Sequence, residues 1–192
     1  MSTQLQELSQ QFEARFRQLV PFEQEPRNLY EPCAYLLQLG GKRIRPVLCL
    51  MAAQAFDADQ EDAYHIAAAI ELFHNFTLIH DDIMDEAPLR RGKKTVHEKW
   101  NLNTGILSGD AMLILAYQFF ESYEPEIFHK LAKLFSKTAL EVCDGQQMDV
   151  DFETRSDVTI DEYIEMIRLK TSVLVAAALK MGAIVSKTDA KN

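Results

Sequence analysis

Helical patterning dominates this 192-residue sequence. The first segment shows it plainly, because residues 3–20 carry apolar side chains at Leu5, Leu8, Phe12, Phe16 and Leu19. Spacing of three and four places these side chains on one face of an amphipathic helix. No convincing alternation of apolar and polar residues indicates a β-strand, and only seven glycines and six prolines interrupt the chain. The sequence therefore predicts an all-α fold.

The chain divides into long helical segments separated by short breaks. Gly40 and Gly41 end a second helix near Leu39, and Pro46 suits the first turn of the next helix. Thr159 and Glu162 form a capping-box pattern. Further helices are predicted over 61–86, 104–123, 125–151 and 159–185, with a polar basic loop over 87–101. We expect residues 1–192 to form a single domain, a bundle of long, mostly antiparallel helices.

Bulk composition excludes several classes of protein. A net charge of −9 argues against a nucleic-acid-binding protein, which usually carries a basic face. Cys33, Cys49 and Cys143 lie far apart, so we expect reduced thiols in the core of a cytoplasmic protein. The polar N-terminal residues do not resemble a signal peptide. The longest apolar run, 172–185, is shorter than the roughly 20 residues of a membrane-spanning helix and predicts a buried helix.

The predicted helix 61–86 carries a polar stripe on an otherwise apolar surface. His74, Thr77, Asp81 and Asp85 follow at steps of three, four and four. The β-carbons of the two aspartates should lie about 6 Å apart, where their charges repel without a counterion. Mg²⁺ suits such a pair, because it binds through carboxylates and phosphate oxygens. By itself, the stripe could equally be a solvated acidic helix end.

Two basic clusters accompany the aspartates. Arg90, Arg91, Lys93 and Lys94 follow within one loop, and a second cluster lies in the segment 40–46. Simple charge balance is one explanation. The alternative is anion binding, because arginine donates paired hydrogen bonds to phosphate and glycine permits close backbone approach. Two basic clusters and one metal site would suit two phosphorylated substrates.

Several motifs in order give the sequence a specific resemblance. GGKRIRP, HNFTLIHDDIMD and LRRGKKTVH are followed by Gly145-Gln146-Gln147-Met148-Asp149 and Lys170-Thr171. From about Tyr30 to Met181, the chain resembles trans-isoprenyl diphosphate synthases of the polyprenyl synthetase family. The short-chain type, the geranylgeranyl and farnesyl diphosphate synthases, is the most similar. The resemblance implies the helical isoprenoid synthase fold and a homodimer.

The resemblance also implies a reaction and its residues. A Mg²⁺-dependent prenyltransferase of this family condenses an allylic diphosphate (dimethylallyl, geranyl or farnesyl) with isopentenyl diphosphate and releases diphosphate. Asp81 and Asp85 would bind Mg²⁺, with Asp82 in support, and Arg90 would bind the allylic diphosphate. The implied isopentenyl diphosphate pocket comprises Lys42, Arg45, His74 and Arg91. The implied groups beside the leaving diphosphate and allylic cation are Lys170 and Thr171, with Gln146 and Asp149 as weaker candidates.

Product length in the family depends on what blocks the cavity about one turn before the aspartates. Phe76 and Thr77 stand five and four positions before Asp81. A bulky residue at the fifth position resembles short-chain synthases, whose products have fifteen to twenty carbons. We expect the twenty-carbon product.

One departure from the family pattern bears on activity. The family's second aspartate-rich motif would lie on a later helix, and nothing after Lys180 supplies it. We therefore expect the sequence to be the N-terminal part of a synthase, with doubtful activity alone. A non-catalytic subunit of a two-component synthase is the main alternative. A terpene cyclase would not need the second diphosphate pocket, and a purely structural helical protein would not need the motifs.

Overall fold

The computed structural model describes residues 3–186. In this range the regular structure is helical except for one ladder of two short strands, which confirms the predicted all-α class. The strands are β1 (Leu89–Arg90) and β2 (Lys93–Lys94). The helices are α1 (Thr3–Leu19), α2 (Arg27–Gln38), α3 (Ile44–Ala55), α4 (Gln60–Met84), α5 (Val96–Lys99), α6 (Leu102–Gln118), the 3₁₀-helix η1 (Phe119–Ser122), α7 (Pro125–Phe152), α8 (Ile160–Ile167), the π-helix η2 (Arg168–Ser172) and α9 (Val173–Val185).

The chain forms two compact units, and each is described by itself. The first unit comprises Met1–Val47 and Tyr64–Ser122, and the second comprises Leu48–Ala63 and Tyr123–Asn192. Helices α3 and α4 each contribute residues to both units. A single domain over residues 1–192 stays a prediction.

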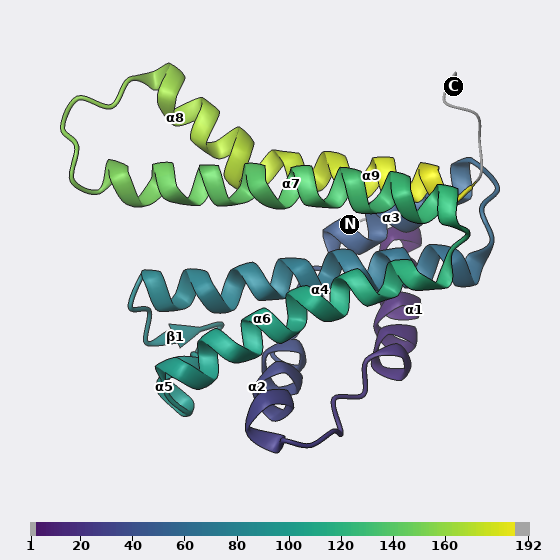
Figure 1. Cartoon of the computed structure of the whole chain (residues 1–192), viewed down its shortest axis with the longest axis horizontal. Coiled ribbons are helices and arrows are strands. Elements are labelled where there is room, and N and C mark those ends of the chain that lie inside the picture. The colour runs from purple at the N-terminus through teal and green to yellow at the C-terminus, as the bar shows by residue number, and fades with distance from the viewer. Residues whose placement is uncertain (1–2, 187–192) are drawn as a thin grey trace. The chain divides into compact units, whose positions relative to one another are not determined.

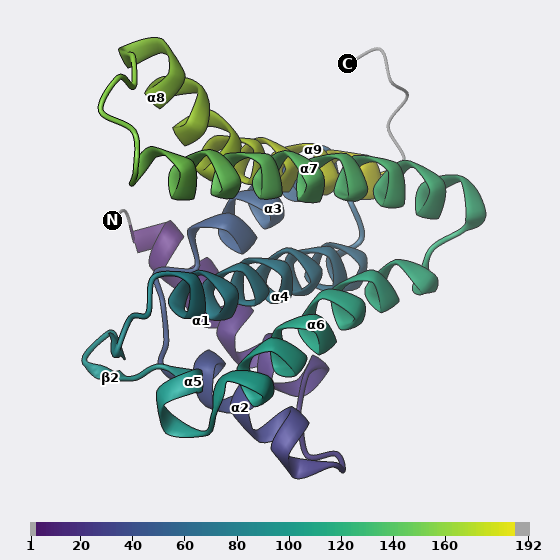
Figure 2. The same ribbon diagram turned by 60° about the vertical axis from the view of Figure 1, so that its left-hand side comes forward.

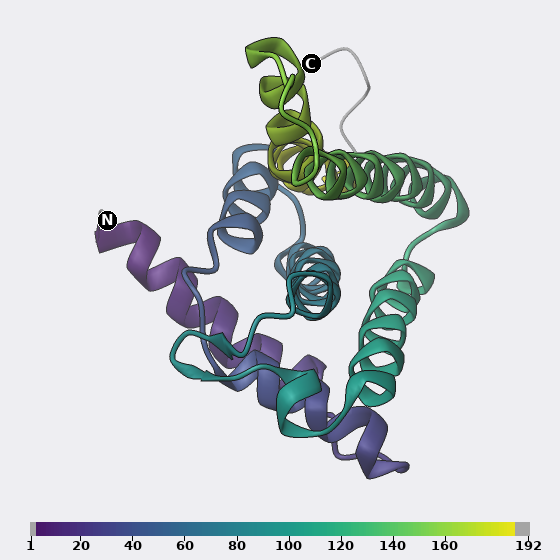
Figure 3. The same ribbon diagram turned by 90° about the vertical axis from the view of Figure 1, so that its left-hand side faces the viewer.

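The first unit contains most of α4, which Figure 3 views nearly along its axis. Ala67, Ala68, Ala69, Ile70 and Leu72 are fully buried, so this helix has no solvent face in its middle. Such a helix cannot be amphipathic, which agrees with its almost continuously apolar sequence.

Helices α2 and α6 of the same unit pack on each other, as Figure 2 shows. The Ser108 hydroxyl on α6 donates to the Leu29 carbonyl oxygen over 2.9 Å. The Cys33 thiol on α2 donates to the Ser108 carbonyl oxygen over 3.4 Å. These bonds satisfy buried polar groups where the two helices meet.

The prediction of an irregular basic loop over 87–101 was wrong in detail. Leu89 pairs with Lys94 and Arg90 with Lys93 in an antiparallel ladder, and α5 follows. Arg91 and Gly92 close the hairpin with φ of 53° and 75°. Two successive residues with positive φ match the right-handed twist of paired strands, which explains the tight turn. The alternating strand pattern was absent because each strand has only two residues.

The second unit is built on α7. Figure 1 shows α9 lying beside α7, after the chain has turned back through α8. The predicted capping box is confirmed: the Glu162 amide donates to the Thr159 hydroxyl over 3.2 Å, and the Thr159 amide donates to the Glu162 carboxylate over 2.9 Å. The predicted helix over 159–185 is confirmed as helical structure from Ile160 to Val185, although the turn Arg168–Ser172 within it is the π-helix η2.

The remaining predictions about burial are confirmed with one exception. Val173, Leu174 and Ala178 are buried on α9, as predicted for the longest apolar run. Cys33 and Cys49 are buried free thiols, whereas Cys143 is a free thiol exposed on α7. Helical rotation turns Cys143 outward while its neighbour Val142 is buried. None of the described helices combines the length and the apolarity that crossing a bilayer requires.

Candidate active site

The acidic end of α4 carries the predicted metal ligands. The Asp85 amide donates to the Asp81 carbonyl oxygen over 2.9 Å, so the helical turn continues just past Met84. The two carboxylates therefore leave the same helix face one turn apart, as the spacing predicted. Asp81 is half-buried and Asp85 is exposed.

Asp82 lies on a different face and has a different partner. Its side chain is only 3% exposed and accepts hydrogen bonds from the Arg90 Nε over 2.9 and 2.8 Å. The Arg90 Nη2 also lies 3.4 Å from an Asp81 carboxylate oxygen. Although burial disfavours its charge, the hydrogen bonds and charges of Asp82, Asp81 and Asp85 raise the pKa of Arg90 above its ordinary value. Asp82 thus holds Arg90 beside Asp81.

The hairpin that carries Arg90 and Arg91 is tied to its surroundings at its base. The Tyr35 hydroxyl donates to the Lys94 carbonyl oxygen over 2.8 Å, and the buried Thr95 hydroxyl donates to the Ala87 carbonyl oxygen over 2.7 Å. A β-carbon at Gly41 would lie 3.2 Å from the Arg91 Nη2. The absence of a side chain at Gly41 lets the Arg91 guanidinium lie against the segment that contains Lys42.

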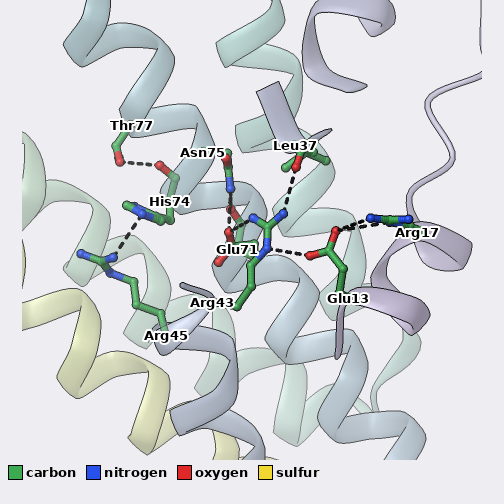
Figure 4. Close-up of polar contacts among 9 residues, drawn as sticks. All are labelled: Glu13, Arg17, Leu37, Arg43, Arg45, Glu71, His74, Asn75 and Thr77. Atoms are coloured by element: carbon green, nitrogen blue, oxygen red, sulfur yellow. Dashed lines mark hydrogen bonds and ion pairs between the residues drawn. The ribbon is translucent and has the colours of Figure 1, made fainter. Parts of the chain in front are cut away.

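Arg45 and His74 meet beside this segment, as Figure 4 shows. The Arg45 Nη1 lies 3.1 Å from the His74 Nε2. Because an arginine can only donate, the His74 Nε2 must accept, and the neutral ring carries its proton on Nδ1. Burial, followed by the charges of four arginines (Arg45, Arg91, Arg90 and Arg43), lowers the pKa of His74 to about 3. His74 is therefore a neutral group within a cluster of cations.

The other predicted residues of this unit lie on or near the same helix. Lys42 is exposed, and the Arg45 Nε is buried with no hydrogen-bond partner among the described residues. The Thr77 hydroxyl donates to the His74 carbonyl oxygen over 2.8 Å, so its hydrogen bond is local (Figure 4). The half-buried Phe76 ring packs against the rings of Phe73 and His80, with centroids 5.6 and 4.7 Å away.

Arg43 is the important residue that the sequence interpretation missed. It is 4% exposed, and its side chain forms ion pairs with Glu71 and Glu13. A signal was available in the sequence: Glu71 stands between Ile70 and Leu72 in the apolar part of α4. A buried carboxylate requires a cation or hydrogen-bond donors, so a partner should have been sought.

In the second unit, the structure brings the other two predicted elements together. The Lys170 ammonium donates to an Asp149 carboxylate oxygen. A β-carbon at Gly145 would lie 2.3 Å from the Lys170 backbone nitrogen, so this glycine allows α7 to approach η2. The Gln146 Nε2 is buried without a hydrogen-bond partner among residues 3–186, whereas Thr171 is exposed. π-Helical turns occur frequently at functional sites.

The donor set at the end of α4 fits Mg²⁺. Within residues 3–186, no group of three or more histidine, cysteine or acidic side chains could hold a metal ion. A zinc or calcium site made only of protein ligands would need such a group. Mg²⁺ instead uses one or two carboxylates and completes its shell with water and phosphate oxygens. Asp81 and Asp85 can supply those carboxylates, because they lie one turn apart on the same face of the helix end, whereas Asp82 is buried against Arg90.

Comparison with known proteins identifies the family. The polyprenyl synthetase family model matches residues 26–192. The chain belongs to this family. The match includes every predicted site residue of both units, from Lys42 to Thr171.

Relatives within the polyprenyl synthetase family are longer than this chain. It is 44% identical over 178 residues to the geranylgeranyl diphosphate synthase of Methanosarcina mazei, covering 92% of this chain and 55% of that protein. A crystal structure of a geranylgeranyl pyrophosphate synthase superposes with a TM-score of 0.94 at 58% identity, covering 100% of this chain and 58% of that one. The chain thus spans about half the length of the curated relatives it matches.

A further relative has a different description. The chain is 40% identical over 159 residues to heptaprenyl diphosphate synthase component 2 of Geobacillus stearothermophilus, covering 81% of this chain and 48% of that protein. The name of that relative denotes one component of a larger synthase.

Proposed function

We propose that the chain carries part of the active site of a short-chain prenyl diphosphate synthase. The enzyme would join an allylic diphosphate head-to-tail to isopentenyl diphosphate and release diphosphate. The product would have fifteen to twenty carbons, and we expect twenty. The observation that carries the proposal is the arginine cluster around neutral His74. His74 lies on α4, the helix whose end also presents Asp81 and Asp85. The membership of the chain in the polyprenyl synthetase family supports the same class of reaction.

The reaction requires a diphosphate to leave an allylic carbon. The carbon–oxygen bond breaks, the diphosphate takes the electron pair, and a delocalised carbocation remains. When bound by Asp81 and Asp85, Mg²⁺ would neutralise charge that develops on the departing phosphate oxygens. Arg90 would donate to the same diphosphate, and Asp82 would keep its guanidinium oriented.

Carbon–carbon bond formation requires the second substrate close by. Lys42, Arg45 and Arg91 would bind the diphosphate of isopentenyl diphosphate, and the buried Arg45 Nε offers a donor for one oxygen. Neutral His74 would keep Arg45 in place without adding another charge. The double bond of isopentenyl diphosphate then attacks the cation, and loss of a proton to the released diphosphate restores a double bond.

The proposal also assigns roles to residues of the second unit and to the apolar side chains around Phe76. Lys170, Thr171 and Gln146 would contact the leaving diphosphate and stabilise the allylic cation, with Asp149 holding the Lys170 ammonium. Phe76, supported by Phe73 and His80, would form the floor that limits product length, with Thr77 beside it. An apolar wall also keeps water from the cation.

We also propose that the protein assembles as a homodimer. Ile106, Leu107 and Ile114 are exposed on α6, and exposed apolar side chains often mark interaction surfaces. Light scattering of the purified chain tests the assembly state. A cytoplasmic location, and an origin as the N-terminal part of a longer synthase, stay predictions.

A direct assay tests the proposed function. The chain is incubated with Mg²⁺, farnesyl diphosphate and labelled isopentenyl diphosphate, and products are separated by length. We expect label in a twenty-carbon product from a chain extended by a second aspartate-rich motif, lost with chelator or with Asp81→Ala. The matched control is Glu126→Ala, which removes an exposed carboxylate at the start of α7. Absence of product from both this chain and a chain extended by a second aspartate-rich motif would refute independent catalysis.

A component of a two-chain synthase is the second candidate function. The similarity to heptaprenyl diphosphate synthase component 2 favours it. The two candidates differ in one measurable respect. A component would make product only when a separately purified partner chain is added, whereas the extended chain of a one-component synthase would act alone.

A further inference from the structure

In the sequence, Arg43 stands between Lys42 and Arg45, two of the three cations of the proposed isopentenyl diphosphate pocket. It has a left-handed backbone conformation, with φ of 49°. This conformation is uncommon for a residue with a side chain and persists only where the surrounding structure holds it. The contacts of the Arg43 side chain explain how it is held.

All three guanidinium nitrogens of Arg43 have partners, as Figure 4 shows. Its Nε donates to the Glu13 carboxylate over 2.8 Å, and its Nη2 donates to the Leu37 carbonyl oxygen over 2.9 Å. Its Nη1 donates to the Glu71 carboxylate. A buried guanidinium engaged in this way is unavailable to a substrate, so its contribution must be structural.

The three partners of Arg43 come from three different helices. Glu13 is on α1, Leu37 is in the last turn of α2, and Glu71 is in the middle of α4. Glu71 is further held by Asn75, whose side-chain nitrogen donates to its carboxylate over 3.0 Å. Arg43 therefore fixes the segment between α2 and α3 against α4.

The anchoring point lies close to the groups that would bind the substrate. Glu71 is three residues before His74, which contacts Arg45. Lys42, the immediate neighbour of Arg43, is exposed, and the Arg45 Nε has no partner among the described residues. The basic motif thus divides into one cation that is engaged internally and two that remain for an anion.

We propose that Arg43 is a positioning residue for isopentenyl diphosphate. By binding Glu71 and Glu13, it sets the backbone that places Lys42 and Arg45 to receive one diphosphate. Its guanidinium donates to Glu13, Glu71 and Leu37, whereas Arg90 is held by Asp82, so we expect the allylic diphosphate to be little affected. The inference rests on the proposed function, because it assigns a role within that pocket.

The test must separate positioning from stability. Arg43→Met alone would leave Glu71 as an unpaired buried charge and would destabilise the fold. The double variant Arg43→Met/Glu71→Met replaces the pair with apolar side chains of similar size, a change that is often tolerated. Arg17→Met is the matched control, because it removes an arginine from an exposed pair with the same Glu13.

Calorimetry of the full 192-residue chain with isopentenyl diphosphate and, separately, with dimethylallyl diphosphate and Mg²⁺ provides the readout. Loss of a well-oriented charged hydrogen bond corresponds to about tenfold weaker binding. We expect the double variant to bind isopentenyl diphosphate about tenfold more weakly, with dimethylallyl diphosphate binding changed less than about twofold. Arg17→Met should resemble the unaltered chain in both measurements.

Each outcome decides a different point. Equal weakening for both ligands, or unchanged affinity for isopentenyl diphosphate, would overturn the positioning role while leaving the proposed function intact. Failure of the unaltered chain to bind either ligand would refute the proposed function and this inference with it. If circular dichroism shows that the double variant is unfolded, Arg43→Lys decides, because lysine keeps the charge but cannot reach three partners. In that case, the proposal requires that Arg43→Lys weakens the binding of isopentenyl diphosphate more than the binding of dimethylallyl diphosphate.

Discussion

The Arg90 Nε lies 2.9 and 2.8 Å from the two carboxylate oxygens of Asp82, so this aspartate binds an arginine within the chain. The three acidic residues near the end of α4 therefore differ in their surroundings. Asp81 and Asp85 share the face that suits a metal ion, whereas Asp82 orients the cation proposed to bind the allylic diphosphate.

Asp82→Asn should weaken both the fold and the proposed allylic site. The amide keeps the size of the carboxylate but loses its charge, and hydrogen bonds to charged groups contribute about 2 kcal/mol. We expect the free energy of unfolding in urea to fall by about that amount, with weaker binding of dimethylallyl diphosphate in calorimetry. The control is Asp157→Asn, which alters an exposed pair with Arg155. Equal effects of the two substitutions would contradict the assignment.

Gly145→Ala should destabilise the second unit. The added β-carbon would lie 2.3 Å from the Lys170 backbone nitrogen and 2.8 Å from the Leu169 carbonyl carbon, atoms that cannot turn away. Overpacking of this kind costs about 2 kcal/mol, more than the roughly 1 kcal/mol that alanine gains over glycine in a helix. Chemical denaturation measures the difference.

Gly105→Ala is the matched control for that prediction. Its β-carbon would meet the Ile83 Cδ1 at 2.9 Å, the flexible end of a side chain. Rotation of Ile83 relieves the contact at little cost, so we expect a small change in unfolding free energy. A Gly145→Ala variant as stable as Gly105→Ala would show that α7 and η2 do not require the close approach.

His74 should make stability depend on pH in a defined window. Its pKa is about 3 in the folded chain, because of burial and nearby arginines, against about 6.5 when unfolded. Above about pH 6.5 the ring is neutral in both states and contributes no pH dependence. As pH falls from 6.5 toward 3, only the unfolded state gains the proton, so the free energy of unfolding falls.

His74→Gln isolates this contribution, because a glutamine oxygen can still accept from Arg45. Urea unfolding near pH 7.5 and near pH 5 should show a smaller decrease for the variant than for the unaltered chain. In carbon-13 NMR spectra of the folded chain at the lower pH, the His74 ring should still show the signals of a neutral imidazole. Parallel pH dependence of the two proteins would mean that His74 titrates alike in the folded and unfolded states.

Phe76→Ala should lengthen the product. The ring packs on Phe73 and His80, so its removal opens space without removing a polar contact. Products made from farnesyl and labelled isopentenyl diphosphate, separated by chain length, should shift beyond twenty carbons. Thr77→Val preserves volume at the adjacent position and should leave the distribution unchanged. An unchanged distribution for Phe76→Ala would count against Phe76 as the floor.

Local spacing in the sequence determined much of the architecture. The helical repeat set most helix positions and placed Asp81 one turn before Asp85, because hydrogen bonds between near neighbours govern that geometry. Thr159 and Glu162 formed their predicted cap for the same reason. The ordered motifs also indicated the family before any contact was known.

Only the tertiary structure decided what each charged residue does. Arg43 and Lys42 are adjacent cations in the sequence, yet one is buried against Glu71 and the other is exposed. Packing selects the buried one, because removing a charge from water requires partners that come from distant segments. The turn at Arg91 and the π-helix beside Gly145 likewise depend on contacts that helical periodicity does not encode.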